Sequence, residues 1–378
     1  MPDLQAVRLL ALAGNIDALI AEIRLHTPLQ ALAQRGGFSL EERSFHDCSA
    51  ADLRRADVLI VQRGLSQRVA RLQRLMRRQG GTVLYEIDDL LTELPDHVSN
   101  QGRVLAQREH LLDCMRQADL VTVSTERLGR TLMPPHWQVV PNYALPLGDA
   151  AMPPLQAGHP VTFVLASMEA LAPHALYQAL RELPAGLARV VAVGPVAASL
   201  AAAGVMVESH PLMPRRAFIT WVRSLPNPVA VIPLEDSRFA ACKSAIKWFD
   251  YGEAGVPVLC SAVSPYCEVV EPGRTGWLVA NDASAWQQAL TQVAMAGEWR
   301  QQVAQAAREA VRARHTLDLT VQAWAAAITH AQQLRQQAGA PSSAGLTRWR
   351  DALALTLDAV GRPLRRFNRA RLARRQQR

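Results

Sequence analysis

We predict an α/β protein with two Rossmann-like domains that face a cleft, followed by a basic, helical C-terminal extension. Three observations predict this arrangement. Short apolar runs rich in β-branched residues alternate with helical stretches, which is the pattern of parallel βαβ units. Five prolines between residues 141 and 160 interrupt the alternation, which then starts again. Beyond residue 340 the composition changes and arginine becomes the dominant charged residue.

Six strands are expected in the first half, because each apolar run is bounded by glycines, polar turns or helical stretches. They are Val7–Ala13, Phe38–Arg43, Val58–Val61, Thr82–Ile87, Leu120–Ser124 and Gln138–Val140. Helical stretches run from the first strand to Gln34 and over residues 66–79 and 101–117. This order predicts one parallel sheet.

The second half repeats the pattern after a linker. Proline cannot extend a helix or serve a central strand, so residues 141–160 are predicted to connect two domains. The expected strands are Val161–Leu165, Arg189–Val193, Val205–Val207, Val229–Ile232, Val256–Cys260 and Gly276–Val279. Helices are expected up to Leu183, up to Ala203, and at 214–223, 244–254, 283–296, 298–313 and 317–337. Gly255 is expected to end the helix at 244–254.

These elements set the domain boundaries. We place the first domain at residues 1–145, the second at 146–340 with a final crossover helix, and the extension at 341–378. Ligands of open parallel sheets bind at the carboxyl ends of the strands. The cleft between the two domains is therefore the expected binding site.

The net charge of +8 comes from the extension. Residues 341–378 contain ten arginines and two aspartates. Removing them from the chain's 41 basic and 33 acidic residues leaves equal numbers of each, so the two-domain body is neutral. The body also contains the only two lysines, Lys243 and Lys247, since every other basic residue is arginine.

Composition excludes several classes of protein. Hydrophobic residues make up 49% of the chain, which rules out wholesale disorder. The five cysteines are odd in number and form no Cys-x-x-Cys pair, which argues against a disulfide scaffold or a zinc site. No signal-peptide pattern is found, and Gly194-Pro195 breaks the charge-free run at 190–207. We therefore expect a cytoplasmic protein.

The two lysines share a helix face with Asp250, since the three residues are spaced i, i+4 and i+7. With Ser244 as a reasonable N-cap, the free N–H groups and positive dipole end of this helix favour a phosphate. Lys243 and Lys247 add compact, mobile charges to the same end. Asp250 can accept hydrogen bonds from sugar hydroxyls. The alternative is an ordinary surface lysine–aspartate pair.

Several motifs surround this helix. They are Gly255-Val256-Pro257-Val258, Glu268-Val269 and Gly273-Arg274-Thr275-Gly276. With them, the segment 232–279 resembles the donor-binding region of GT-B-fold glycosyltransferases of the family 4 type. In the first half, YEIDDLLTELP (85–95), ADLVTVSTERL (118–128) and VVPN (139–142) resemble the acceptor half of bacterial surface-polysaccharide members. The resemblance covers roughly residues 5–335.

The resemblance implies a metal-independent sugar transfer from a nucleotide-diphosphate sugar, with retention of anomeric configuration. By position, Asp250 stands where the family binds the donor ribose. Lys243 and Ser244 stand at the loop and helix start that hold the diphosphate. Three further positions are implied near the donor: Glu268, Val269 and Gly14. Lys247 is expected to stabilise charge on the departing diphosphate.

The sequence departs from the family pattern at two places. The family's Glu-x7-Glu motif would place its first glutamate at position 242, where this chain has cysteine, and Glu235 or Asp236 are possible substitutes. The family also supplies Arg and Lys after the first strand of the donor half. Residues 166–180 contain neither, only His174. A degenerate, inactive member therefore stays open as an alternative.

Asp88 and Asp89 follow a predicted strand and are candidates for catalysis. A carboxylate at that place can orient or deprotonate an acceptor hydroxyl. The alternative is that one of them caps the next helix. Glu86 can face either side of its strand. Ser124-Thr125 is expected to supply a helix cap, and Asn142 a structural contact at the domain junction.

The extension carries an amphipathic pattern. Apolar residues recur three or four positions apart, namely Leu346, Trp349, Leu353, Leu357, Val360, Leu364 and Phe367. Arginines fill the other faces, and Gly361 and Pro363 are expected to split the helix. This composition suits an anionic membrane surface. The alternatives are a poorly ordered basic end and a nucleic-acid-binding segment.

We conclude that the sequence predicts a glycosyltransferase acting from a nucleotide-diphosphate sugar to a glycan or lipid-linked acceptor in surface-polysaccharide synthesis. The alternative is a non-catalytic nucleotide- or sugar-binding protein of the same fold, anchored by its extension. We expect no cofactor and no metal, with the nucleotide sugar as substrate. The expected partners are the donor, the acceptor and an anionic membrane surface contacted by residues 341–378, without nucleic acid. We place the protein in the cytoplasm, peripheral on the inner face of the membrane.

Overall fold

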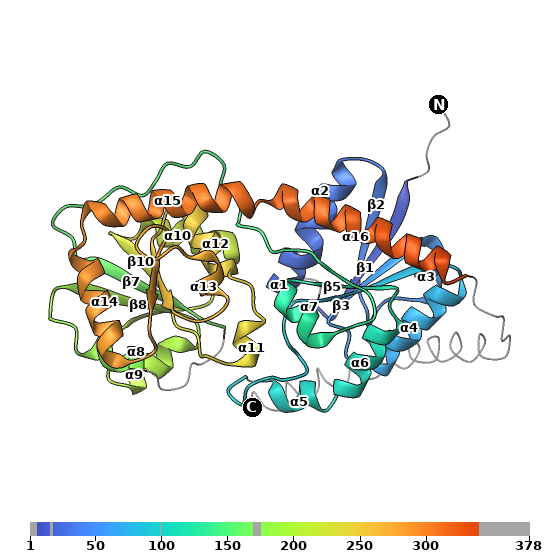
Figure 1. Ribbon diagram of the computed structural model, residues 1–378, viewed down its shortest axis with the longest axis horizontal. Coiled ribbons are helices and arrows are strands. Elements are labelled where there is room, and N and C mark those ends of the chain that lie inside the picture. Colours follow the sequence, from blue (N-terminus) through green and yellow to red (C-terminus); the bar gives the residue numbers. More distant parts are fainter. Residues whose placement is uncertain (1–5, 16–17, 99, 169–174, 340–378) are drawn as a thin grey trace, which may run out of the picture.

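The computed structural model describes residues 6–15, 18–98, 100–168 and 175–339. These residues form two α/β domains, each built on a parallel six-stranded sheet (Figure 1). The amphipathic extension at 341–378 lies outside the described residues. The predicted fold class, two Rossmann-like domains in the GT-B arrangement, is confirmed for the two-domain body.

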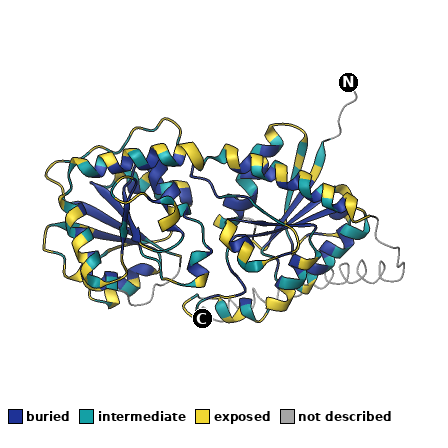
Figure 2. Cartoon of the chain, in the orientation of Figure 1, coloured by how far each residue is buried: buried dark blue, intermediate teal, exposed yellow. Residues whose placement is uncertain are grey.

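The sheet of the first domain has the order β2-β1-β3-β4-β5-β6. Its strands are β1 Val7–Ala13, β2 Phe38–Ser44, β3 Val58–Gln62, β4 Thr82–Ile87, β5 Leu120–Val123 and β6 Trp137–Val139. Every pairing is parallel, as in Leu59 opposite Val83. All residues of β3 and β4 are buried, because helices cover both faces of a parallel sheet (Figure 2).

The sheet of the second domain has the order β12-β11-β10-β7-β8-β9, also entirely parallel. Its strands are β7 Val161–Ala166, β8 Ala188–Val193, β9 Glu208–His210, β10 Pro228–Ile232, β11 Val258–Ser261 and β12 Trp277–Val279. The strand predicted at Val205–Val207 is wrong, since β9 begins three residues later. As an edge strand it pairs only with β8, so polar residues suffice there.

Helices connect the strands of both domains. In the first they are α1 Leu19–Ala21, the π-helix η1 Glu22–His26, α2 Thr27–Gln34, α3 Ala50–Arg55, α4 Gln67–Arg78, α5 Gln101–Leu105, α6 Arg108–Gln117 and α7 Glu126–Leu132. In the second they are α8 Ala175–Arg181, α9 Val196–Ala202, α10 Arg215–Ser224, α11 Arg238–Ala241, α12 Ile246–Ala254, α13 Tyr266–Val269, α14 Ala283–Met295 and α15 Glu298–Arg314. The helix predicted at 101–117 is thus two helices, α5 and α6.

The last helix, α16 Leu317–Gln337, returns to the first domain. Figure 1 shows α15 and α16 following one another along the top of both domains. Trp324 and Ile328 of α16 are buried in one apolar cluster with Leu9 and Ile60 of the first sheet. The end of the described chain therefore completes the core of its first domain, as expected for a crossover helix.

Two local features place the residues discussed below. Gly255 ends α12 in the left-handed conformation, with φ of 69°, as predicted. Thr125 caps α7 through a hydrogen bond from the Leu128 amide, which confirms the expected cap. Among the described residues, none of the helices combines the length and apolar character that crossing a bilayer requires.

Candidate functional site

The loops that follow the strands of the two sheets face each other where the domains meet. Asp88 and Asp89 follow β4 directly, and Arg63 follows β3. From the second domain, Lys247 lies in the first turn of α12 and Lys243 precedes the helix, so the prediction that Lys243 shares a helix face with Lys247 and Asp250 is wrong. We call these five residues the interdomain site. They lie at the place predicted for ligands of open parallel sheets.

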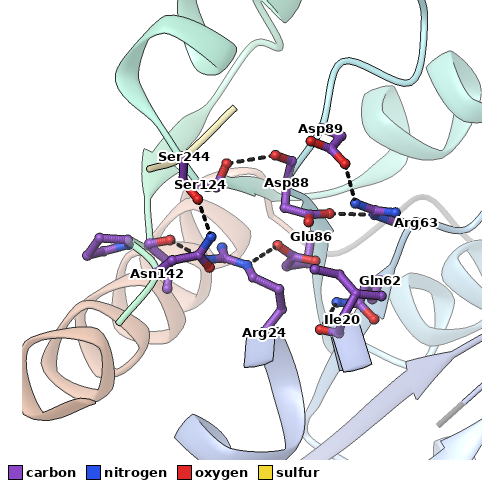
Figure 3. Close-up of polar contacts among 12 residues, drawn as sticks. Ile20, Arg24, Gln62, Arg63, Glu86, Asp88, Asp89, Ser124, Asn142 and Ser244 are labelled. Carbon is purple, nitrogen blue, oxygen red and sulfur yellow. Dashed lines mark hydrogen bonds and ion pairs between the residues drawn. The ribbon is translucent and has the colours of Figure 1, made fainter. Parts of the chain in front are cut away.

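Asp88 and Asp89 form ion pairs, and neither caps a helix. Arg63 donates through Nε to Asp88 and through a terminal nitrogen to Asp89 Oδ2 at 2.8 Å (Figure 3). The Asp88 backbone carbonyl accepts a hydrogen bond from Ser124 Oγ at 2.8 Å. The helix-capping alternative is therefore wrong, since the next helix begins at residue 101. Both carboxylates are held by neighbouring donors in fixed orientations.

Sequence analysis did not identify Arg63. Its φ of 48° is left-handed, which is uncommon and costly for a residue other than glycine. Its amide donates to the Glu86 carbonyl at 2.9 Å, and its side chain joins both aspartates. Burial opposes its charge, but Asp88 and then Asp89 raise the pKa of Arg63 above its ordinary value. The available sequence signal was an arginine directly after a buried strand and before Gly64.

Lys243 reaches across from the second domain to the first. Its Nζ lies 2.9 Å from Asp89 Oδ1 and 4.3 Å from the centre of the Phe239 ring. Burial opposes ionisation of Asp89, but Lys243 and then Arg63 lower the pKa of this carboxyl below its usual range. Asp89 is therefore a carboxylate with both oxygens engaged, one by each domain.

Lys247 has a weaker partner. Its Nζ donates to the backbone carbonyl of Ala166, the last residue of β7, at 2.8 Å. The side chain is exposed to solvent, yet the surrounding protein atoms desolvate its ammonium, and Lys243 repels it. Together these effects lower the pKa of Lys247 to about 8. Lys247 therefore contacts a neutral carbonyl and lies beside a second ammonium group, an arrangement that is suited to an anionic ligand.

Ser244 does not cap the helix that follows it. The N-cap of α12 is Ala245, which has no side-chain cap, so the predicted cap is wrong. The Ser244 hydroxyl instead accepts a hydrogen bond from Asn142 Nδ2 at 2.6 Å. Asn142 lies in the linker, and this bond therefore joins the segment just before α12 to the domain junction.

The junction is built on a buried ion pair. Arg24, carried by η1, donates to Glu86 Oε1 at 2.7 Å, and both side chains are almost completely buried. Arg24 also donates to the Val140 carbonyl and to Asn142 Oδ1, at 2.7 and 2.8 Å (Figure 3). The alternating face of β4 that carries Glu86 thus points into the protein. Asn142 has the structural role at the junction that was expected.

Asp250 belongs to the same junction. Its two oxygens accept hydrogen bonds from Arg215 at 2.8 and 2.6 Å, and Oδ1 also accepts from the Leu145 amide at 2.9 Å. Arg215 further donates to the Tyr143 carbonyl and packs over the Tyr143 ring. The predicted contact of Asp250 with sugar hydroxyls stays a prediction, and in this structure the carboxylate secures the linker.

The other predicted donor residues lie around the site. Glu268 pairs with Arg127 of the first domain at 2.9 Å and accepts a hydrogen bond from Ser264 Oγ at 2.6 Å. Val269 packs partly against the core of the second domain. Gly14 follows β1 and lies against the Phe45 ring. Their predicted roles toward the donor stay predictions.

The segment Glu235–Lys243 docks on the loop Asp89–His97 of the first domain, and we call this contact the interdomain clasp. Three side-chain pairs run antiparallel along it: the ion pairs Asp89–Lys243 at 2.9 Å and Glu93–Arg238 at 3.0 Å, and the contact between His97 and Glu235 at 3.9 Å. Thr125 Oγ1 donates to the Cys242 carbonyl at 2.9 Å. Glu235, a possible substitute for the motif glutamate, therefore takes part in the clasp.

Cys242 is an apolar anchor of this clasp. Its side chain is fully buried, and with Phe239 it joins the apolar core cluster of the first domain. Burial raises the pKa of its thiol. The position where the family places its first motif glutamate is thus occupied here by a neutral group between the domains. Among the described residues, no group of three or more His, Cys, Asp or Glu is placed to hold a metal ion.

The comparisons with known proteins agree with this architecture. Residues 222–326, which contain α12 and both lysines, match the model of a family described as "Glycosyl transferase-like". No curated protein sequence matches the chain.

Solved structures are similar in fold. A structure of Alr3699/HepE from Anabaena with UDP and glucose matches with a TM-score of 0.57 at 14% identity, covering 85% of this chain and 99% of that one. Sucrose-phosphate synthase from Thermosynechococcus elongatus matches with a TM-score of 0.60 at 15% identity, covering 89% and 100%. A glycosyltransferase from Rickettsia africae matches with a TM-score of 0.58 at 10% identity, covering 86% and 99%.

The family match and the two-domain fold together support a glycosyltransferase. The protein carries a glycosyl transferase-like domain at residues 222–326 within a chain of the GT-B fold.

Proposed function

We propose that the protein transfers a sugar from a nucleotide-diphosphate sugar to a hydroxyl of a glycan or lipid-linked acceptor during surface-polysaccharide synthesis. The observation that carries the proposal is the placement of Lys243 and Lys247 at the start of α12, where Lys243 contacts Asp89 of the other domain. Cations that face a carboxylate across a domain boundary suit a reaction between an anionic donor and a hydroxyl acceptor.

The donor side of the site supplies charge stabilisation. The start of α12 offers free backbone N–H groups and the positive end of the helix dipole. Lys243 and Lys247 add two ammonium groups where negative charge develops on the departing nucleoside diphosphate. We propose that these lysines provide this charge without a metal ion. Ser244, Asp250, Glu268, Val269 and Gly14 complete the proposed donor contacts.

The acceptor side supplies a carboxylate. In the proposed step, the bond between the anomeric carbon and the diphosphate oxygen breaks, and that oxygen keeps the electron pair. A new bond forms from the anomeric carbon to the acceptor oxygen, whose proton passes to Asp89. Asp88 and Arg63 keep Asp89 oriented. The proposed step retains the anomeric configuration, with the acceptor entering on the side from which the diphosphate leaves. The short distance between Asp89 and Lys243, which would contact the acceptor and the diphosphate respectively, supports this proposal.

UDP and UDP-sugars are the first donors to test, since the similar Anabaena protein is described in complexes with UDP and with UDP-glucose. Isothermal titration of the full chain with a panel of nucleotides and nucleotide sugars is expected to find binding. Lys247→Ala should weaken it about tenfold or more, because a charge-assisted contact is lost. Arg130→Ala, an exposed arginine on α7, is the matched control. The transferase proposal ends if the parent protein binds none of the panel.

The pH dependence of donor binding tests the same residue. Lys247 has a pKa of about 8 in the free protein and binds an anion only when protonated. Donor affinity should therefore fall by up to about tenfold between pH 7 and pH 9. The fall should be smaller in Lys247→Ala. Equal pH profiles for the two proteins would contradict the assigned role.

One observation favours a non-catalytic binding protein as the second candidate. Cys242 replaces the first glutamate of the family motif and is buried in the clasp. A protein of this kind would bind the nucleotide sugar without turnover. Release of nucleoside diphosphate in the presence of a polysaccharide and lipid-linked acceptor panel distinguishes the two, and donor binding without such release favours the second candidate.

We propose that residues 341–378 bring the enzyme to the inner face of the cytoplasmic membrane, near a lipid-linked acceptor. Their ten arginines and apolar stripe support this location. Vesicles of anionic phospholipid should carry the full chain upward in flotation, and a chain that ends at residue 340 should stay below. Equal flotation of both chains would contradict the proposal.

A further inference from the structure

The Lys243 ammonium has two roles that conflict. In the structure it neutralises Asp89, at 2.9 Å from Oδ1. The proposed function needs the same ammonium on the donor diphosphate. A compact charge on a flexible side chain can move between such partners without a movement of the backbone.

The backbone on both sides of this contact is anchored. Ahead of Lys243, Phe239 and Cys242 are buried in the core of the first domain, and the Cys242 carbonyl accepts from Thr125. Behind it, Ser244 accepts from Asn142. The other clasp pairs, Glu93 with Arg238 and His97 with Glu235, do not involve Lys243. Lys243 can therefore change partners by rotating its side chain while the clasp stays in place.

Asp89 is blocked as long as Lys243 stays on it. Its Oδ2 accepts from Arg63 at 2.8 Å and its Oδ1 from Lys243. With both oxygens engaged and two cations beside it, this carboxylate is a poor acceptor for a further hydroxyl proton. Removal of Lys243 frees Oδ1, and Arg63 continues to hold Oδ2. The pair is partly exposed, at 32% for Lys243 and 22% for Asp89, so a soluble ligand can reach it.

We propose that the donor diphosphate competes with Asp89 for Lys243, so that donor binding unmasks Asp89 for the acceptor and the donor binds first. This inference rests on the proposed function, since it takes Lys243 as a diphosphate ligand. It makes Asp89 a residue whose availability is set by the other substrate. The enzyme without a donor therefore lacks an acceptor-ready carboxylate.

The proposal predicts that a substitution which impairs sugar transfer tightens nucleotide binding. Asp89→Asn should tighten binding of UDP about three- to tenfold, because the competing charge is lost, while it reduces sugar transfer. Glu93→Gln removes a carboxylate from the same loop without touching Lys243, and should leave UDP affinity unchanged. Isothermal titration with UDP measures all three proteins.

A double-mutant cycle separates competition from a general electrostatic effect. If Asp89 only repelled the diphosphate, Asp89→Asn would tighten UDP binding equally with and without Lys243. Competition instead predicts that Asp89→Asn has no effect on UDP affinity in a Lys243→Ala background. Equal tightening in both backgrounds, or no tightening in the parent background, overturns the proposal. Failure of the parent protein to bind any nucleotide would instead end the proposed function and this inference with it.

The scarcity of lysine provides a second measurement that does not depend on affinity. Reductive methylation with carbon-13 labels Lys243, Lys247 and the N-terminal amine, and keeps their charge. Lys243→Arg and Lys247→Arg assign the signals. Without ligand, the Lys243 signal should differ between the parent and Asp89→Asn, and with saturating UDP the two should coincide. A Lys243 signal that UDP does not move overturns the proposal.

Discussion

Two of the contacts between the domains differ in character. On the linker side lies a buried joint, in which the pair Arg24–Glu86 of the first domain and the pair Arg215–Asp250 of the second each hold the linker through residues 140–145. On the side of the interdomain site lies the clasp, in which Glu93–Arg238 is exposed to solvent and Asp89–Lys243 is partly exposed. Both contacts hold the same two domains. A charged group that loses its partner in the joint is not reached by water, whereas water can solvate a charged group that loses its partner in the clasp.

This difference distinguishes side chains that hold the domains together from side chains that can exchange their partner for a ligand. Breaking a buried pair leaves an uncompensated charge, so the joint has one stable arrangement. Breaking an exposed pair costs little, so a clasp residue can leave its partner for a ligand. The structure places Lys243 in the clasp and Asp250 in the joint, although the two are neighbours on one predicted helix face. The predictions below test this contrast, from the largest expected effect to the smallest.

The joint should be sensitive to loss of one charge. Arg24→Leu leaves Glu86 buried and unpaired, and should lower the free energy of unfolding by about 3–5 kcal/mol. The double variant Arg24→Leu/Glu86→Leu should recover a large part of this loss, because no isolated charge remains. Urea unfolding measures both. Arg8→Leu, at an exposed ion pair, is the control and should cost much less. A cost as small for Arg24→Leu would remove the distinction between joint and surface.

The joint should also weaken in acid through His315, whose carbonyl accepts from Ala144 of the linker. The ring stacks on Phe249 at 3.8 Å, and burial, with Arg314, lowers its pKa to about 4. The unfolded chain binds this proton near pH 6.5. Its contribution is therefore complete above about pH 6.5 and is lost as the pH falls toward 4, by about 1–2 kcal/mol at pH 5.

Urea unfolding of His315→Gln should accordingly lose less stability between pH 7 and pH 5 than the parent protein does. His136→Gln replaces an exposed histidine and serves as the control. If all three proteins lose the same stability over this range, His315 does not control the acid sensitivity of the joint.

The exposed clasp pair Glu93–Arg238, which lies outside the interdomain site, should matter least. Glu93→Gln removes the partner of Arg238, and both side chains are largely exposed. The free energy of unfolding should fall by at most about 1 kcal/mol, and less at high salt. Thermal unfolding at low and high ionic strength measures this. A loss comparable to that of Arg24→Leu would mean that the clasp is as rigid as the joint.

Much of the fold could be predicted, because its signals are local. The strands Val7–Ala13 and Thr82–Ile87 and the helix 317–337 have the predicted bounds. Each is an apolar run or a 3.6-residue period between clear breakers. The prediction failed at β9, an edge strand whose position depends on pairing with β8 rather than on its own composition.

The site could be predicted only in part. The scarcity of lysine identified Lys243 and Lys247, and the end of a strand identified Asp88 and Asp89. Arg63 was missed because one more arginine carries little information in an arginine-rich chain. Its strained backbone and its two carboxylate partners become visible only in the folded protein.

The periodicity of apolar residues along the chain predicts the order of strands and helices, because burial on a sheet or a helix face requires apolar residues at regular local intervals. The choice of charge partners is different, because it depends on which distant segments the fold brings together. Asp89 and Lys243 are 154 positions apart, and Arg215 and Asp250 are 35 apart. Tertiary structure alone therefore decided that Asp250 holds the joint, whereas Asp89 pairs with Lys243, the lysine that we propose binds the donor diphosphate.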